Sequence, residues 1–196
     1  AFRDNLPAIF PGREEVPKTL IFAKTDSHAD DIIQTVREEF GEGNAFCKKV
    51  TYRAGQDKKL ADGSVQQGED PKSILAQFRN EYHPRIAVTV DMIATGTDVK
   101  PLECLLFMRD VKSRNYFEQM KGRGTRSLSM DGLTPVTPSA KTAKTHYVIV
   151  DAIGVTKSLK TASQPLITKP GVPLKDLAMG ILMGATDTDS ASSLDG

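Results

Sequence analysis

Short runs of consecutive apolar residues recur along the chain at intervals that leave room for a helix between them. Runs of about four to eight apolar residues, bounded by polar or turn-forming residues, are typical of strands that a sheet buries on both faces. The stretch 45–53 instead alternates apolar and polar residues, as a half-buried strand does. We therefore predict strands at 18–23, 45–53, 86–90, 102–108 and 147–150.

The segments between these strands place apolar residues three and four positions apart, which is the period of an α-helix. The clearest set follows the first strand and comprises Ala29, Ile32, Ile33, Val36 and Phe40. Polar residues at 25–27 offer N-cap oxygens before it, and Gly41 ends it. A second helix is predicted to begin at Asp70-Pro71 and a third at Ser113.

Strands that alternate with helices in this order predict an α/β fold, with a mostly parallel sheet and helices on both faces. Such sheets bind ligands at the carboxyl ends of their strands, so we expect functional residues there. Residues 1–17, interrupted by three prolines, predict an irregular lead-in, and residues 127–144 predict a mobile loop. After the last strand we expect an extension at 152–183, whose helix belongs either to this domain or with a missing neighbour, and a disordered tail at 184–196.

Composition and charge narrow the function classes. The 196 residues carry 26 basic and 25 acidic side chains, so the net charge of +1 gives no overall signature of nucleic-acid binding. No apolar run is long enough to span a membrane. Cys47 and Cys104 do not make a disulfide scaffold, and no histidine has a partner at metal-ligand spacing, so we predict no metal site. Without an initiator Met or a secretory signal, the chain is expected to be a piece of a longer cytoplasmic protein.

The most informative segment is QMKGRGTR, which runs from Gln119 to Arg126. On a helix, Gln119, Arg123 and Arg126 are four and three positions apart and can project from the same side. Gly122 and Gly124 remove side-chain bulk between them, so another surface can approach closely. Two guanidinium groups aimed at one spot suit a phosphate. From spacing alone, a basic and solvated turn explains the segment equally well.

A second segment, VDMIATGTDV, follows the strand predicted at 86–90. Gly96 permits a positive φ or a close approach of the backbone to a ligand. Asp98 has a carboxylate that accepts hydrogen bonds from a ribose hydroxyl or caps the following segment. Taken alone, the segment is explained better by an ordinary turn between two strands.

Together with LIFAKT in the first predicted strand, these segments resemble motifs IV, V and VI of superfamily 2 helicases, in the same order. The resemblance covers residues 18–151 and implies a RecA-like fold, that of the second motor domain of such enzymes. The amino-acid sequence of residues 86–126 resembles still more closely that of the motor (R) subunit of type I restriction enzymes.

The resemblance implies roles for five residues toward ATP with Mg²⁺. In the family, motif VI supplies arginines that reach the ATP γ-phosphate, and Arg123 and Arg126 match these positions. Gln119 matches the first residue of that motif, which links the nucleotide to the neighbouring motifs. Gly96 and Asp98 match motif V positions near the nucleotide. The nucleotide would bind only together with the first motor domain.

The resemblance also implies contacts to DNA. Members of the family hold the phosphates of one strand with loops at the carboxyl ends of strands, where Lys24, Thr25, Arg53 and Thr89 are expected. A basic residue there attracts phosphate without reading sequence, although Lys24 and Arg53 are explained equally well, each on its own, as solvated charges. Val90 stands where the family often has Thr, so one backbone contact lacks its hydroxyl. We expect weak, salt-sensitive DNA binding by the chain alone.

Missing motifs limit what the chain can do by itself. It contains no G-x-x-x-x-G-K-[ST] phosphate loop and no Asp-Glu pair at the end of a strand. The acid-x-Lys spacings at 98–100 and 110–112 do not fit a nuclease, because one lies inside motif V and the other precedes a helix. Since ATP hydrolysis needs the phosphate cradle, the metal and the arginine together, we expect the chain alone to be inert.

These observations predict the second motor domain of an ATP-dependent DNA translocase, most similar to the R subunit of a type I restriction enzyme. The implied partners are double-stranded DNA, the first RecA-like domain of the same chain, and the methyltransferase and specificity subunits of the restriction complex. Two alternatives remain open. One is a domain of another superfamily 2 repair or RNA helicase, and the other is an interaction module without ATPase coupling.

Overall fold

The computed structural model describes residues 2–51, 58–59, 65–66, 68–90 and 98–158. The chain divides into two compact units, and all of these residues lie in the first, Ala1–Thr161. Along the chain, the elements are α1 (Phe2–Ile9), β1 (Thr19–Phe22), α2 (Asp26–Phe40), β2 (Cys47–Lys49), β3 (Lys58–Lys59), β4 (Val65–Gln66), α3 (Pro71–Asn80), β5 (Ile86–Thr89), β6 (Cys104–Phe107), α4 (Arg114–Lys121), the 3₁₀ turn η1 (Gly122–Gly124), α5 (Met130–Leu133) and β7 (Val148–Asp151).

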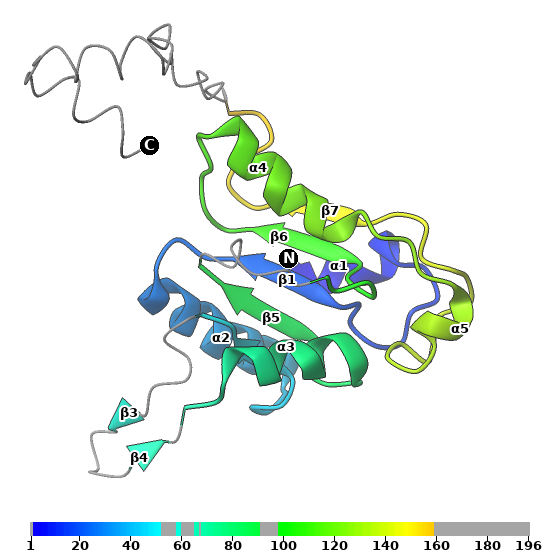
Figure 1. The fold of residues 1–196 in the computed structure, drawn as a ribbon, viewed down its shortest axis with the longest axis horizontal. Helices are drawn as coiled ribbons and strands as arrows, with labels where there is room; N and C mark the ends of the chain where they lie inside the picture. Colours follow the sequence, from blue (N-terminus) through cyan, green and yellow to red (C-terminus); the bar gives the residue numbers. More distant parts are fainter. Residues whose placement is uncertain (1, 52–57, 60–64, 67, 91–97, 159–196) are drawn as a thin grey trace, which may run out of the picture. The chain divides into compact units, whose positions relative to one another are not determined.

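Five strands form one parallel sheet in the order β2-β5-β1-β6-β7, and β3 and β4 form a separate antiparallel pair (Figure 1). The strands of the main sheet start level with one another, because Thr19 of β1 pairs with Ile86 on one side and with Cys104 on the other, and Cys104 pairs with Val148. The sheet therefore has one edge of amino ends and one edge of carboxyl ends. Each predicted strand is present, and the predicted α/β class is confirmed.

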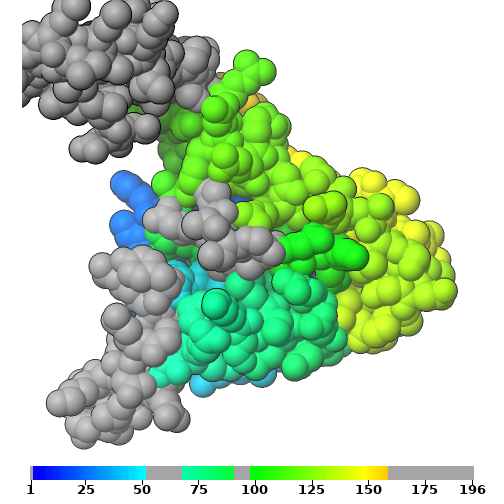
Figure 2. Space-filling model, in the orientation of Figure 1, coloured from blue at the N-terminus to red at the C-terminus, as the bar shows by residue number. Residues whose placement is uncertain are grey.

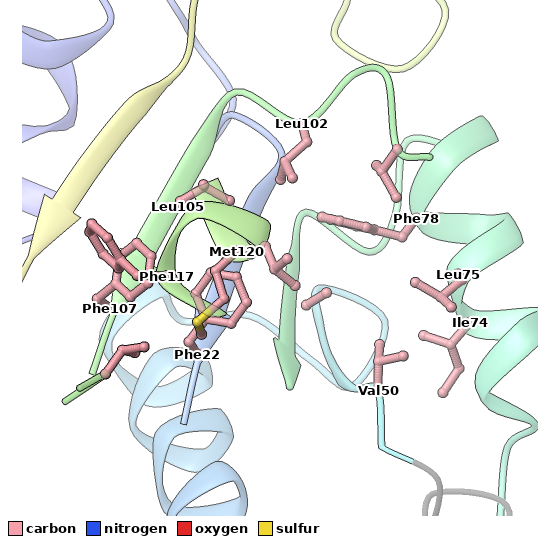
Figure 3. Close-up of a cluster of buried hydrophobic side chains, with 14 of the residues drawn as sticks. Phe22, Val50, Ile74, Leu75, Phe78, Leu102, Leu105, Phe107, Phe117 and Met120 are labelled. Carbon is pink, nitrogen blue, oxygen red and sulfur yellow. The ribbon is translucent and has the colours of Figure 1, made fainter. Parts of the chain in front are cut away.

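Side chains alternate across the sheet and are buried on both faces, as the continuous apolar runs predict. One face packs against α3 and α4, with Phe22, Phe107 and Phe117 at its centre (Figure 3). The side chains of α3 and α4 cover much of the side seen in Figure 2. The opposite face, which includes Ile21 and Val88, packs against Ala29, Ile32 and Ile33 of α2. This two-sided burial fixes where the sheet edges and the helix ends lie.

The helix ends follow the capping signals in the sequence. The Thr25 hydroxyl accepts from the backbone N–H of His28 at the start of α2, and Gly41 ends that helix at a φ of 67°. Asp70 caps α3 ahead of Pro71, and Ser113 caps α4.

The lead-in corrects one prediction, because residues 2–9 form helix α1 instead of an irregular segment. Phe2, Leu6 and Ile9 are four and three positions apart, which is helical spacing, and all three are half-buried. Pro7 lies inside this helix and concealed that spacing, because proline is usually excluded from helix interiors.

The segment at 127–144 corrects a second prediction, because it is ordered around a small core of its own. It contains α5 and buries Leu133, Val136 and Ala140 together. The buried guanidinium of Arg85 donates hydrogen bonds to the carbonyl of Val136 and to the hydroxyl of Thr137, at 3.3 Å for the latter. Three apolar residues are too few to show a helical period, so the sequence pattern indicated a loop.

The expected extension is described only as far as residue 158, where a turn after β7 is held by Asp151. The rest of it, together with the tail predicted at 184–196, lies outside the described residues. No helix among the residues that the structure describes is long and apolar enough to cross a membrane.

Candidate functional site

The arginine segment 123–126 follows helix α4, which the core holds through Phe117 and Met120. Gln119 lies on the exposed side of that helix. The helix ends at Lys121, and one 3₁₀ turn then carries Arg123, so Arg126 lies beyond both. The three residues therefore do not share one continuous α-helix, because the chain tightens into a 3₁₀ turn at Gly122 and Arg126 follows that turn.

An ion pair joins the two sequence motifs. The Nε atom of Arg126 lies 3.4 Å from Oδ1 of Asp98, although 28 positions separate them. The two side chains remain 65% and 41% exposed, so the pair contributes at most about 1 kcal/mol to stability. Arg123 is half-buried. The tertiary structure thus brings Asp98 to the arginine segment. The ion pair between Asp98 and Arg126 is solvated, so another anion can replace the carboxylate.

The side chain of Lys144 binds the backbone of the arginine segment. Its Nζ donates a hydrogen bond to the carbonyl of Gly124 at 2.8 Å and another to the carbonyl of Arg126. The backbone of Lys144 also exchanges two hydrogen bonds with Leu128, at 3.0 and 2.8 Å. Burial lowers the pKa of Lys144, while the carboxylates of Glu103 and Asp98 act in the opposite direction.

Gly124 is required by the close approach of the chain's own Tyr147. A Cβ atom at Gly124 would lie 2.5 Å from Cγ and Cδ2 of that ring. At Gly122, by contrast, an added Cβ would meet nothing within 4 Å. The surface that approaches closely at Gly124 belongs to the same domain, and approach by another surface stays a prediction.

The arginine segment lies at the edge of the sheet where the strands begin. Helix α4 starts beyond the carboxyl end of β6 and runs back over the sheet (Figure 1). Its far end brings Gly124 against Tyr147, the residue before β7. Asp98, paired with Arg126, lies at the same place. The expectation that functional residues gather at the carboxyl ends of the strands is therefore wrong for this group, because a helix that follows a strand runs antiparallel to it.

The residues predicted to contact DNA lie at the opposite edge. Lys24 lies two residues after the end of β1, and its side chain is exposed. Thr25 is also exposed, although its hydroxyl accepts the capping hydrogen bond from His28 at 3.1 Å. Thr89 is fully buried at the end of β5, and its hydroxyl has no hydrogen-bond partner among the described residues. Such burial does not suit a direct contact between Thr89 and a phosphate.

Two of the predicted site residues, Arg53 and Gly96, lie outside the described residues, so the structure does not place them.

A cavity of about 710 Å³ opens beside Lys24, lined by residues that follow β1, β6 and β7. Its lining includes Lys24, Arg109 and Lys112, together with the ring of Tyr116. Arg109 donates to the Val90 carbonyl at 2.9 Å, and its guanidinium lies 5.6 Å from the centre of the Tyr116 ring. Sequence reasoning did not single out Arg109, and it considered Lys112 only as part of a rejected nuclease spacing. Their position just after a predicted strand was the available signal.

The described residues contain no group of three or more His, Cys, Asp or Glu side chains placed to hold a metal ion.

Comparison with known proteins identifies the relatives of the chain. No family model matches it. The chain is 30% identical over 164 residues to the endonuclease subunit of the type I restriction enzyme EcoKI of Escherichia coli K12, a match that covers 82% of the chain. It is 24% identical over 113 residues to the EcoAI endonuclease subunit of Escherichia coli, which covers 56% of the chain. The chain spans 12% of the length of each relative.

A solved structure shows the same fold. It is a fragment of a putative HsdR subunit of a type I restriction enzyme from Vibrio vulnificus YJ016, with a TM-score of 0.54 and 22% identity. The match covers 76% of this chain and 26% of that one. The chain is therefore similar in sequence to one section of the endonuclease subunits of type I restriction enzymes, and its parallel α/β sheet shares the fold of the HsdR fragment.

Proposed function

We propose that the chain is the second motor domain of an ATP-dependent DNA translocase, within the R subunit of a type I restriction enzyme. The observation that carries this proposal is the ion pair between Asp98 and Arg126, which gathers the segments resembling motifs V and VI at one exposed edge. A surface that presents two arginines and a replaceable carboxylate is suited to a phosphate group brought by a second domain.

The residues present fit the γ-phosphate end of ATP with Mg²⁺. Arg126 is exposed and held by one solvated ion pair, so its guanidinium can exchange Asp98 for phosphate oxygens at little cost. Arg123, one turn earlier, adds a second fork of N–H donors, and Gln119 offers an exposed amide on the adjoining helix. When bound, the nucleotide supplies the phosphoryl group whose developing charge these donors stabilise.

The chain supplies this half of the site and no other part. Its sequence has no phosphate loop, and the described residues hold no carboxylate cluster for a metal. An arginine finger contributes about 10³ to 10⁵ in rate only when those other parts are in place. The first RecA-like domain of the same polypeptide would provide them, and closure of the two domains would bring Arg123 and Arg126 to the phosphate.

The opposite edge would hold the DNA backbone. Lys24, Arg109 and Lys112 line one cavity at the carboxyl ends of β1 and β6 together with a single carboxylate, Asp110, so basic side chains outnumber acidic ones there in a chain of nearly zero net charge. Such a surface attracts phosphates without reading bases, and its binding weakens as salt rises. Within the restriction complex, the methyltransferase and specificity subunits would be the further partners.

The proposal is tested by DNA-stimulated ATP hydrolysis in the complete motor subunit that contains this domain. We expect Arg123→Ala to lower the rate about a hundredfold or more while ATP binding is retained, because the lost donor acts mainly in the transition state. Arg114→Ala, an exposed arginine at the start of α4, serves as the control and should leave the rate unchanged. An unchanged rate in Arg123→Ala would show that the chain is a structural or docking domain.

A further inference from the structure

We propose that Lys144 is the positioning residue that orients the arginine segment for the phosphate. This inference rests on the proposed function. Lys144 contacts neither nucleotide nor DNA in this scheme and acts only through the backbone that carries Arg126 and follows Arg123.

The contacts of Lys144 are aimed at that backbone. Its ammonium group has three N–H donors, and two of them bind carbonyls on either side of Thr125, those of Gly124 and Arg126. The two bonds fix the orientation of the Gly124–Thr125 and Arg126–Ser127 peptide groups. Together with the paired backbone of Leu128 and Lys144, they set the direction in which the chain leaves the 3₁₀ turn.

Other contacts also act on the arginine segment: the Tyr147 ring lies against Gly124, Asp98 pairs with Arg126, and the Thr125 hydroxyl donates to the Gly122 carbonyl at 2.8 Å. Thr125 and Arg126 are exposed, and Gly124 has no side chain. The 3₁₀ turn closes with a 3.4 Å hydrogen bond from the Thr125 N–H to the Gly122 carbonyl. Lys144 supplies two hydrogen bonds that reach the carbonyls of this segment from another part of the chain, and it therefore takes a direct part in orienting the segment.

Lys144 is itself anchored in the interior. Its side chain is only 4% exposed, and the carboxylates of Glu103 and Asp98 favour its charged form. Glu103 is buried as well and pairs with Arg13 of the lead-in at 2.5 Å. A buried ammonium keeps its position far better than a solvated one, and this is the property that a positioning residue needs.

The test measures DNA-stimulated ATP hydrolysis in the complete motor subunit carrying Lys144→Met, which keeps the chain length and removes the amine. We expect kcat to fall about tenfold or more, because small misplacements of a catalytic group are costly. The KM for ATP should stay within about twofold, because the phosphate loop of the other domain binds the nucleotide. Lys141→Met, an exposed lysine in the same segment, is the matched control and should behave as wild type.

A second variant separates positioning from stability. Leu133→Ala empties part of the small core beside Lys144 and leaves the ammonium in place. If the loss of kcat in Lys144→Met reflects positioning, it exceeds the loss in Leu133→Ala even where the two variants melt at the same temperature. Equal losses of kcat at equal melting temperature would overturn the proposal.

A double variant shows whether Lys144 acts through the arginine. In a subunit that already carries Arg126→Ala, Lys144→Met should lower kcat by a smaller factor than it does in the wild type, because the side chain that it orients is already gone. If the fold-decrease in kcat of the double variant equals the product of the two single decreases, the positioning role of Lys144 is refuted, while the proposed role of the arginines still stands. Arginine variants with no effect of their own would instead refute the proposed function.

Discussion

Gly122 and Gly124 are two positions apart but differ in the space around them, and this difference is testable. In Gly124→Ala the new methyl group would meet the base of the Tyr147 ring at 2.5 Å, where the ring cannot swing away. We expect a loss of about 1–3 kcal/mol in the free energy of unfolding. The displaced backbone should also lower ATP hydrolysis by the complete motor subunit. Urea denaturation of the chain and a rate assay measure the two effects.

Gly122→Ala is the internal control for that prediction. Its φ and ψ of −55° and −19° are helical, and no atom lies within 4 Å of the added Cβ. We expect stability to stay the same or to rise by up to about 1 kcal/mol, because alanine restricts the unfolded chain. A substitution at Gly122 that destabilises as much as one at Gly124 would contradict the packing explanation.

Among the elements, strand β7 is the one whose end depends most on a single carboxylate. Asp151 accepts from the backbone N–H groups of Val155 and Thr156, both at 2.8 Å, and from the Thr156 hydroxyl at 2.6 Å. Partial burial alone would raise the pKa of Asp151, but these hydrogen bonds outweigh it and hold the pKa at about 2, below its ordinary 3.8.

We predict that Asp151→Asn lowers stability by about 1 kcal/mol at neutral pH, a value that allows for solvent screening. Because the folded pKa lies below the unfolded one, the folded chain binds fewer protons in between. The contribution is therefore fully present above about pH 4 and is lost as the pH falls toward 2. Urea denaturation of both forms between pH 2 and pH 7 checks this, and a difference that grows toward low pH would contradict it.

At the scale of the whole molecule, the two candidate sites lie at opposite edges of the sheet. The basic cavity beside Lys24 lies where strands end, and the arginine segment lies where strands begin. Under the proposed function, domain closure would act on the phosphate at one edge and on DNA at the other, so the two ligands would not compete for space.

Because the sequence lacks a phosphate loop, we predict that the chain alone releases no phosphate from ATP, with or without DNA. Phosphate release by the purified chain, compared with the complete motor subunit at the same concentration, provides the measurement. Hydrolysis by the chain alone that disappears in Arg123→Ala would show that the missing parts are not needed.

The sequence by itself determined the order of strands and helices, the caps and the identity of the motifs. These are local properties: a run of apolar residues predicts a strand buried on both faces wherever the strand is placed. The caps at Thr25 and Ser113 depend only on residues one turn away. Arg123 and Arg126 could be singled out for the same reason, because the motif that contains them is only eight residues long.

Only the tertiary structure decided where these parts meet. The pairing of Asp98 with Arg126, the carbonyl contacts of Lys144 and the ring over Gly124 join residues 18 or more positions apart. No pattern along the chain encodes such contacts, because they arise only after α4 has run back over the sheet. The buried Lys144 shows this most clearly: among the polar residues of 127–144 it looks like a solvated charge, and burial becomes favourable only where folding brings two carbonyls to its amine.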